Sequence, residues 1–545
     1  EDGVRRVWSW AELRNATAAA SKALLEAGVG AGDVVAAWMP NTPETVIVML
    51  AAQSLGAVFT STSPDFGPSG VLDRFGQVAP KVLVAADGYV YGGKNHDRTE
   101  ALAQIVRGLP TVQQVWLVHE LDHDAEPEVH IRTRYLRDIL AAGVDALEFV
   151  EMPFDAPGFI LYSSGTTGAP KCLVHRSAGL LLKHASEHRW HLDVRPGDRV
   201  FWFTTCGWMM WNWLVSALAA GATVVLYDGS PFHPEPDHLW RIAEEEQVSL
   251  FGVSAKYLDA CAKQGLRPVV DRDLSSLRTI GSTGSPLSPE AFRYVYADVA
   301  PEVHLASISG GTDICGCFVI GDPTLPVWPG ELQGPALGAD VDVFDDDGRS
   351  LRGEAGVTGE LVCRNALPSM PISFLGDPSG DRYNAAYFER FPGVWSHGDF
   401  ALWTDHDGMM ILGRSDATLN AGGVRIGTAE IYRQVEAFDE VLEALAIGQA
   451  FDDDTRVVLF VRLAPGHHLD DLLRARIVKR LREQCSPRHV PAKIVEVADL
   501  PRTRSGKLAE LAVADVVHGR PVRNTEALAN PESLGLFTDL EELRT

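Results

Sequence analysis

Short apolar runs alternate with amphipathic, helix-length segments through the first 330 residues of the chain. An apolar run at residues 34–39 precedes a predicted helix that ends near Leu55, with Thr42 as its N-cap and Pro43 in its first turn. The same pattern predicts strands near residues 81–85, 115–118, 159–162, 199–203, 223–227, 250–253 and 303–307. Strands that alternate with helices are typical of a parallel sheet, so this part is predicted to be α/β.

The pattern changes after Gly330. Short alternating strands, for example at 341–344 and 359–362, predict a β-rich subdomain over about 330–415. The last part predicts an α+β order, with helices near 429–438 and 472–484 and strands near 442–447, 457–463 and 493–497. We therefore expect a large domain over residues 1–415, of parallel-rich sheets with helices plus the subdomain, and a small α+β domain over 416–545. At 545 residues, a large and a smaller domain are the natural expectation.

Charge and cysteine content narrow the class of partner. The formal net charge of −25 argues against nucleic acid or an anionic membrane surface as a partner, because such binding needs clustered Lys and Arg. Seven cysteines show neither a disulfide framework nor zinc-ligand spacing, which favours a reducing cytoplasm. The longest apolar stretch, residues 213–227, is interrupted by Ser216, Gly221 and Thr223, so no membrane span is expected.

The strongest chemical signal is a loop rich in hydroxyls and glycines at residues 163–171. Its glycines allow a close backbone approach to phosphates, its hydroxyls are donors, and a lysine ends it. It differs from the common P-loop, because Pro170 precedes Lys171 and Cys172 follows it. By itself it is equally compatible with a flexible surface loop. The residues predicted to bind phosphate are Ser163, Ser164, Gly165, Thr166, Thr167, Gly168 and Lys171.

Four further segments supply groups for the rest of a nucleotide. After the strand near 303–307, Thr312 is predicted to hold a phosphate oxygen and Asp313 a magnesium ion. Asp399, beside a glycine, is suited to accept hydrogen bonds from ribose hydroxyls. Two guanidiniums, Arg414 and Arg425, flank a glycine-rich bend. Lys507 ends a basic loop that begins at residue 501.

The order and spacing of these motifs resemble the acyl-adenylate-forming superfamily, which includes acyl-CoA synthetases, peptide-synthetase adenylation domains and firefly luciferase. The resemblance spans nearly the whole chain. It implies that the 163–171 loop is the phosphate loop, that Thr312 and Asp313 are the Thr-Glu pair, and that Lys507 is the catalytic lysine. Asp313 departs from the usual Glu, which shortens its reach to Mg²⁺ and keeps the charge. The resemblance also implies a hinge at Asp416, about which a mobile C-terminal domain turns.

Other roles are implied by the same resemblance. Thr312, Arg414 and Lys507 are expected to be catalytic, and Asp399 to bind the ribose. ATP, CoA and Mg²⁺ are the expected co-substrates and cofactor. The remaining residues expected to contact ATP are Gly284, Ser285, Pro286, Gly310 and Gly311, with Arg414 and Arg425 completing a charge clamp.

The acyl substrate is predicted from two segments and from the closest resemblance. Gly310 stands where acetyl-CoA synthetases have a tryptophan that closes the acyl pocket, so a longer acid is expected. The segment that includes Cys206, Gly207 and Trp208 lacks the aspartate with which peptide-synthetase domains anchor an amine. Within the superfamily the chain is most similar to acetoacetyl-CoA synthetases, which implies acetoacetate. Butyrate or another short acid, and transfer to a carrier protein, remain alternatives. A non-catalytic sensor is disfavoured because Lys507 and Asp313 are present.

For CoA, the resemblance implies that Gly422 and Gly423 line a pantetheine channel. Arg482 is a further candidate for the CoA phosphates, although a solvated arginine on a helix explains it as well. Acylation of Lys507 would remove its charge. Regulation by a lysine acetyltransferase and a deacetylase is therefore a further hypothesis.

Overall fold

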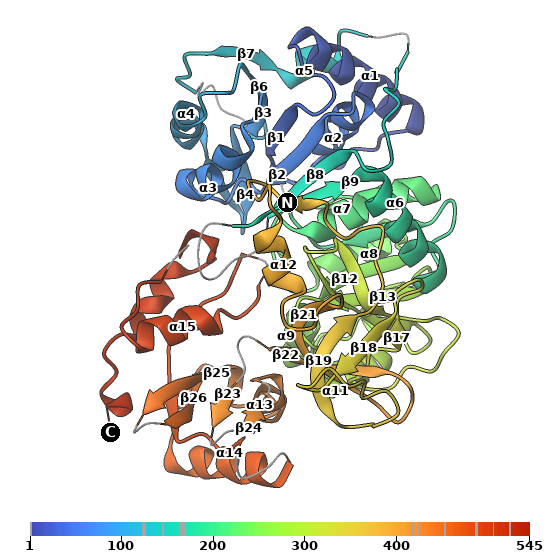
Figure 1. Ribbon diagram of the computed structural model, residues 1–545. Coiled ribbons are helices and arrows are strands. Elements are labelled where there is room, and N and C mark those ends of the chain that lie inside the picture. Colours follow the sequence, from blue (N-terminus) through green and yellow to red (C-terminus); the bar gives the residue numbers. More distant parts are fainter. Residues whose placement is uncertain are drawn as a thin grey trace.

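The computed structural model describes residues 3–121, 127–143, 146–162, 170–415, 419–421, 424–426, 428–451, 454–484, 489–504, 506–522 and 525–544. Two largely parallel sheets with helices on both faces form the greater part of the molecule. Antiparallel sheets and a smaller α+β unit at the C-terminal end complete it (Figure 1). The predicted fold class is thus confirmed.

The first sheet has eight strands in the order β20-β9-β8-β2-β1-β3-β6-β7. Six of them run parallel, while β9 and β20 are antiparallel to their neighbours. The strands are β1 (Val34–Trp38), β2 (Val58–Thr62), β3 (Val82–Ala86), β6 (Gln114–Val118), β7 (Arg132–Tyr135), β8 (Pro157–Tyr162), β9 (Cys172–Arg176) and β20 (Ser373–Phe374).

Successive side chains of the strand β1 point to opposite faces of the sheet, and helices cover both faces. Val35 and Ala37 pack toward α1 (Trp10–Glu26), α2 (Pro43–Ser54) and α5 (Leu136–Leu140), whereas Ala36 and Trp38 pack toward α3 (Pro68–Val78) and α4 (Thr99–Gly108). Successive strand residues point to opposite faces, so a strand covered on both sides is apolar throughout. A small hairpin of β4 (Gly88–Tyr91) and β5 (Lys94–Asp97) follows β3.

The N-terminal ends of two helices differ in how they are capped. Ser9 caps α1 in a capping box, because its side chain accepts from the Glu12 amide while the Glu12 side chain accepts from the Ser9 amide. Thr42 occupies the N-cap position of α2, but its side chain makes no capping hydrogen bond. The start of α2 therefore relies on Pro43, whose fixed φ suits a first helical turn.

The second sheet is fully parallel, in the order β11-β10-β12-β13-β14. Its strands are β10 (Arg199–Trp202), β11 (Thr223–Val225), β12 (Leu250–Ser254), β13 (Thr279–Thr283) and β14 (His304–Ser307). One face packs on α8 (His238–Glu245), α9 (Ala255–Lys263) and α11 (Pro289–Tyr294). The other packs on α6 (Ser177–Ser186) and α7 (Met209–Ser216). The remaining short helices are α10 (Pro268–Asp271), η1 (Glu187–His191), η2 (Ala217–Ala220) and η3 (Val295–Val299).

Glycines in the second sheet make room for Trp202. A Cβ at Gly252 would lie 2.0 Å from the indole of Trp202, and one at Gly281 would lie 2.7 Å from it. Gly281 belongs to β13, which the apolar pattern did not predict as a strand. A glycine is a poor strand residue by itself, so the reason for it here is the tertiary contact with a fully buried indole.

Antiparallel sheets follow β14. One contains β15 (Ser309–Gly311), β16 (Gly316–Ile320) and β17 (Gly334–Pro335), and another contains β18 (Val341–Phe344), β19 (Thr358–Cys363), β21 (Trp395–Trp403) and β22 (Met409–Arg414). The helix α12 (Asp381–Tyr387) lies between β20 and β21 in the chain. The antiparallel strands β15 and β16 precede Gly330, whereas β18, β19, β21 and β22 follow it. The predicted β-rich subdomain over about 330–415 stays a prediction.

The C-terminal unit, orange to red in Figure 1, lies beside the rest of the molecule. It contains β23 (Leu419–Ala421), β24 (Val424–Ile426), α13 (Thr428–Val435), β25 (Val441–Phe451), β26 (Asp454–Leu463), α14 (Asp471–Gln484), β27 (Lys493–Glu496) and α15 (Glu510–Val517). The short helices η5 (Thr525–Ala527), η6 (Pro531–Phe537) and η7 (Glu541–Leu543) end it. Phe537 packs edge-on against Phe460, with ring centroids 4.8 Å apart. The predicted boundary residue Asp416 lies outside the described residues.

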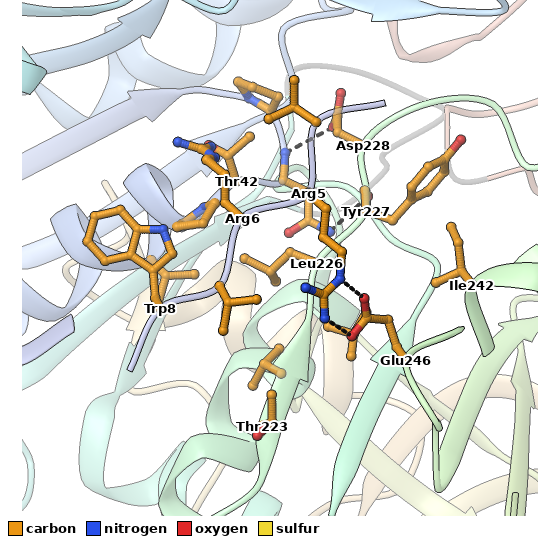
Figure 2. A pocket seen from close by; sticks show the side chains of 18 of the residues that line it. Arg5, Arg6, Trp8, Thr42, Thr223, Leu226, Tyr227, Asp228, Ile242 and Glu246 are labelled. Atoms are coloured by element: carbon orange, nitrogen blue, oxygen red, sulfur yellow. Dashed lines mark hydrogen bonds and ion pairs between the residues drawn. The ribbon is translucent and has the colours of Figure 1, made fainter. Parts of the chain in front are cut away.

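A cavity of about 800 Å³ lies under the N-terminal segment. Figure 2 shows Arg5 bonded to Glu246 at this cavity. The Arg5 Nη2 atom lies 3.1 Å from Glu246 Oε2, and the Asn41 amide donates to Asp228 over 2.9 Å. None of the residues that line it belongs to the predicted nucleotide motifs, so the cavity is separate from the candidate site. Among the described helices, none is long and apolar enough to cross a membrane.

Candidate active site

The candidate site lies where strands of both parallel sheets end. Gly284 follows β13 with a φ of +96°, the β15–β16 hairpin follows β14, and Lys171 precedes β9. In open α/β sheets, ligands bind outside the carboxyl ends of the strands. The phosphate-loop residues Ser163, Ser164, Gly165, Thr166, Thr167 and Gly168 lie outside the described residues.

Asp399 and Arg414 face each other across two antiparallel strands. They are register partners in β21 and β22, and Arg414 Nη1 donates to Asp399 Oδ1 over 3.2 Å and to the His397 carbonyl over 3.3 Å. The other carboxylate oxygen, Oδ2, lies 3.6 Å from His397 Nε2. The Asp399 residue is only 8% exposed. Strand pairing thus sets the position of both charges.

Gly398 is required between these groups. Its φ is +83°, and a Cβ there would lie 2.6 Å from Arg414 Nη2. Any side chain at this position would push the guanidinium away from Asp399. The His-Gly-Asp sequence is therefore explained by the close approach of arginine to the backbone.

Asp313 lies at the tip of the β15–β16 hairpin and accepts a hydrogen bond from the Tyr387 hydroxyl. The Tyr387 ring stacks on Trp395, with centroids 3.7 Å apart and planes 12° apart. Burial acts to raise the pKa of Asp313, but His397, Tyr387, Arg414 and Lys171 outweigh it and hold that pKa below its ordinary value. The carboxylate form is therefore favoured.

Lys507 reaches the same place from the C-terminal unit. Burial lowers its pKa, Asp399 and Asp313 oppose that effect, and Arg414 adds to it. These interactions bring the ammonium group near the charges of the N-terminal part, although the residue as a whole is exposed. The loop is closed locally, because the Thr503 amide donates to the Lys507 carbonyl over 2.7 Å and the Lys507 amide donates to Thr503 Oγ1 over 3.1 Å.

Polar contacts are among those that join the C-terminal unit to the rest of the described structure. Lys256 Nζ lies 2.9 Å from Glu436 Oε2. Lys263 Nζ donates to the carbonyls of Val441 and Leu442 over 3.0 and 2.8 Å. Arg504, three residues before Lys507, pairs with Asp65 over 2.7 Å. The first two of these contacts come from α9. Arg504 also lies over the Phe66 ring, 4.5 Å from its centroid.

The arrangement suits an anionic ligand. Lys171, Arg414 and Lys507 supply cations, while Asp399 and Asp313 supply carboxylates. Lys171 is exposed, with Nζ 5.4 Å from the Phe374 ring centroid. A polyphosphate can meet the cations while a carboxylate accepts from sugar hydroxyls. Such a site can neutralise charge as a phosphoryl group is attacked.

The glycines before Thr312 have two different surroundings. A Cβ at Gly310 would lie 1.9 Å from the Gly316 carbonyl oxygen, so the β15–β16 pairing requires glycine there. At Gly311 a Cβ would lie 3.1 Å from the His397 ring. The backbone approach accounts for Gly310 without reference to an acyl chain. Its predicted role in acyl length stays a prediction.

The predicted acyl-pocket residues lie in different cores. The Cys206 thiol donates to the Pro40 carbonyl over 3.2 Å and packs in the core of the first sheet. Gly207 is exposed, and a Cβ there would meet the Ser63 amide at 3.2 Å. Trp208 is half-buried against the core of the second sheet, which also contains Cys317, the register partner of Gly310. The described contacts do not bring these residues into one pocket.

For the remaining predicted residues, the structure gives their exposure or their position in a strand. Ser285 is half-buried and Pro286 is exposed after β13. Arg425 lies in β24, opposite Asn420 in β23. Arg482 is exposed near the end of α14. Gly422 and Gly423 lie outside the described residues.

Two side chains at the site were not predicted to have a role there. Tyr387 comes from α12, which no motif marks, and it meets Asp313 across 74 positions of sequence. His397 stands two residues before Asp399, so its motif offered a signal, but only the tertiary structure shows that it faces both carboxylates.

No group of three or more His, Cys, Asp or Glu in the described part is arranged to hold a metal ion. Asp313 offers one ionised carboxylate. This fits Mg²⁺, which keeps several waters and is usually bound by one or two carboxylates together with substrate phosphates.

Two family models match the chain. The model described as AMP-binding enzyme matches residues 2–370, and that described as AMP-binding enzyme C-terminal domain matches residues 434–507. The matched ranges include Asp313 and Lys507, whereas Tyr387, Asp399 and Arg414 lie between them.

Individual relatives match over nearly the full length of the chain. The acetoacetyl-coenzyme A synthetase of Rhizobium meliloti (strain 1021) is 57% identical over 549 residues, which cover all of this chain and 83% of that protein. The acetoacetyl-CoA synthetase of Mus musculus is 44% identical over 545 residues, which cover 98% of this chain and 80% of that protein.

Solved structures are also similar to this chain over most of its length. The acetoacetyl-CoA synthetase from Streptomyces lividans matches with a TM-score of 0.92 at 45% identity, over 98% of this chain and 82% of that chain. An anthranilate CoA ligase in complex with anthranoyl-AMP matches with a TM-score of 0.78 at 20% identity, over 92% of this chain and 90% of that chain. The second similarity concerns the fold.

Proposed function

This chain belongs to the AMP-binding enzyme family, and we propose that it is an acetoacetyl-CoA synthetase. The reaction joins acetoacetate to CoA while ATP is cleaved to AMP and pyrophosphate. The observation that carries the proposal is that the charges of Lys507, Arg414, Asp399 and Asp313 interact with one another, in a chain that is 57% identical to such a synthetase along its whole length.

In the first step, a carboxylate oxygen of the acid attacks the α-phosphorus of ATP. An oxygen–phosphorus bond forms, the bond to the pyrophosphate oxygen breaks, and acyl-AMP results. The nucleophile is already charged, so no general base is needed. Two anions must approach each other, and Lys507 and Arg414 are placed to offset their charge. Thr312 offers a hydroxyl to a phosphate oxygen.

Mg²⁺ and the ribose are assigned to the two carboxylates. Asp313 is ionised and lies at the hairpin tip, which suits a ligand of Mg²⁺. When bound, the ion would neutralise phosphate charge. Asp399 is held by Arg414 through Oδ1, which leaves the Oδ2 side for ribose hydroxyls. The residues of the 163–168 loop, with Lys171, are proposed to hold the phosphates.

In the second step, the CoA thiol sulfur attacks the acyl carbonyl carbon and AMP leaves. Lys507 is not needed there. We infer that the C-terminal unit then turns about Asp416 and withdraws Lys507. In support, the ion pairs Lys256–Glu436 and Arg504–Asp65 are partly exposed, and such pairs exchange readily for water. Gly422 and Gly423 would then line the pantetheine channel, with Arg482 near the CoA phosphates.

Two statements about the cellular setting belong to the proposal. The six cysteines of the described part are free, which is expected for a protein of the reducing cytoplasm. Lys507 is accessible to solvent, so an acetyltransferase and a deacetylase can act on it. Mass spectrometry that always finds Lys507 unmodified in the native protein would count against that regulation.

The test is CoA-dependent release of AMP with ATP and Mg²⁺, with acetate, acetoacetate, butyrate and 3-hydroxybutyrate compared side by side. A clear preference for acetoacetate is expected. Equal use of butyrate would replace the proposal by a short-chain acyl-CoA synthetase of broader specificity. No AMP release with any of the four acids would contradict it.

A further inference from the structure

A cluster of buried polar side chains lies behind the hairpin that carries Thr312 and Asp313. It comes from α6 and the η1 turn that continues it, and its members are Lys183, His184 and Glu187, which are 4%, 1% and 0% exposed. Neither the sequence motifs nor the reaction steps above use these residues.

His184 is bonded to the hairpin turn itself. Its Nε2 donates to the Cys315 carbonyl over 2.5 Å, and burial lowers the pKa of the imidazole, which favours the neutral ring. Cys315 has a φ of +41°, in the left-handed region that side chains other than glycine rarely adopt. Cys315 comes two residues after Asp313. The bond from His184 therefore holds a strained residue next to the proposed magnesium ligand.

Glu187 accepts hydrogen bonds from both β16 and α7. Its Oε1 accepts from the Cys317 amide over 2.7 Å, and its Oε2 accepts from Trp213 Nε1 on α7 over 2.8 Å. Lys183 Nζ lies 3.2 Å from Oε1. Cys317 is the register partner of Gly310. One carboxylate thus ties the β15–β16 hairpin to α7.

The chemistry of Glu187 is specific to a carboxylate. Both partners, the Cys317 amide and the Trp213 indole, are donors, so glutamine would turn its own NH₂ toward one of them. The packing is also close, because a Cβ at Gly316 would lie 3.0 Å from Glu187 Oε1 and 3.1 Å from Lys183 Cγ. Apolar side chains of similar volume often stabilise a core as well as a buried ion pair does, so stability alone explains this cluster poorly.

We propose that His184 and Glu187, with Lys183 as the counter-charge, are positioning residues of the nucleotide site, because they fix the turn that presents Thr312 and Asp313. The inference rests on the proposed function in so far as those two residues bind MgATP. Misplacement of a binding group by about 1 Å can cost on the order of 10²-fold in rate. The cluster therefore acts on the affinity for MgATP without touching it.

The experiment measures binding of MgATP to the whole protein by calorimetry, in the absence of acid and CoA. His184→Ala and Glu187→Gln are each expected to weaken binding by about tenfold or more. His188→Ala is the matched control. His188 is equally buried on the same segment, but its Nε2 contacts the Trp213 carbonyl and Ser216 rather than the hairpin. The control is expected to lower thermal stability like His184→Ala and to leave MgATP affinity unchanged.

A conservative variant and assays of the two half-reactions distinguish a positioning role from a general loss of structure. His184→Gln, whose amide can donate to the Cys315 carbonyl, is expected to recover most of the affinity. In His184→Ala, thioester formation from supplied acyl-AMP and CoA is expected to fall less than adenylate formation does.

The outcomes also separate the two proposals. Normal MgATP binding in both His184→Ala and Glu187→Gln would overturn this inference alone, as would equal weakening in His188→Ala. If Glu187→Gln does not fold, His184→Ala decides, since it removes a single neutral bond. Wild-type protein that binds no MgATP would overturn the inference and the proposed function together, and wild-type protein that binds MgATP but activates no acid would overturn only the function.

Discussion

The two parts that form the candidate site hold their charges in different ways. Asp399 and Arg414 are register partners in a four-stranded sheet, and Asp313 sits on a hairpin backed by the buried cluster of α6. Lys507 stands on a loop of the C-terminal unit, which meets the rest of the described structure here through Arg504–Asp65 and the α9 lysines.

The difference matches what each group has to do. A nucleotide stays bound through both steps of the proposed reaction, so its ligands need constant distances, and strand pairing with buried support provides them. A cation that is proposed to act in only one step gains from a loop whose ion pairs are partly exposed, because such pairs exchange readily for water. The predictions below test this contrast between fixed and exchangeable groups.

The largest effect is expected from Lys507→Ala. Adenylate formation should fall by roughly 10²–10³-fold, because a preorganised cation that meets developing charge is lost. Thioester formation from supplied acyl-AMP and CoA should be nearly unchanged. Single-turnover assays of the two half-reactions measure this. An equal loss in both would contradict the idea that Lys507 serves one step only.

Gly398→Ala is expected to have the next largest effect. Its Cβ would lie 2.6 Å from Arg414 Nη2, so the guanidinium must move from Asp399, and adenylate formation should fall by about tenfold. Gly393→Ala is the control, since Gly393 has a φ of +79° and no atom within 4 Å of the new Cβ.

Both alanines adopt a left-handed φ, which costs about 1–2 kcal/mol. Similar losses of thermal stability are therefore expected in the two variants, with the loss of activity in Gly398→Ala alone. Equal activity in the two variants would mean that the position of Arg414 does not matter for adenylation.

Breaking the contact between α9 and the C-terminal unit should have a smaller effect. Lys256→Met removes the pair with Glu436, which is partly exposed and is worth about 0.2–1 kcal/mol. Adenylate formation should fall by less than about fivefold, and thioester formation should not fall.

The matched control is Lys81→Met, which removes a pair of similar exposure, Lys81–Asp33, that lies wholly within the N-terminal part. It should alter neither half-reaction. A Lys256→Met variant that behaves in the same way would show that this contact does not hold the unit in place.

The smallest effect on catalysis is expected for Glu120, which lies beside the cavity under the N-terminal segment. Burial, followed by nearby carboxylates, raises its pKa from 4.5 to about 8. The folded protein therefore keeps a proton that the unfolded chain releases, and this contribution to stability is lost as pH rises from about 4.5 to about 8.

The Glu120→Gln variant cannot ionise at this position, so it does not lose stability in this way as pH rises. Its thermal midpoint relative to wild type is thus expected to increase between pH 6 and pH 8, with no change in adenylate formation. A difference in midpoint that does not vary with pH would contradict the raised pKa. A change in adenylation would contradict the separation of this cavity from the site.

Local sequence patterns were sufficient to predict many of the strands and helices. The strands near 34–39 and 341–344 and the α+β order of the last part follow from hydrophobic periodicity, which depends only on neighbours in the chain. β13 was missed because Gly281 interrupts its apolar pattern, and the reason for that glycine is Trp202 on another strand. The Thr42 side chain, predicted to cap α2, makes no such bond, because a suitable residue type does not ensure the required geometry.

The sequence by itself determined which chemical groups are available and in what order, since motifs such as 163–171 and 501–507 are read from adjacent residues. Only the tertiary structure decided which of them meet. Tyr387 contacts Asp313, His184 contacts Cys315 and Lys507 comes near Asp399, each across a long stretch of chain, whereas Cys206 is buried in a core. The physical reason is that these contacts depend on how strands pair and helices pack, and no local run of residues specifies that arrangement.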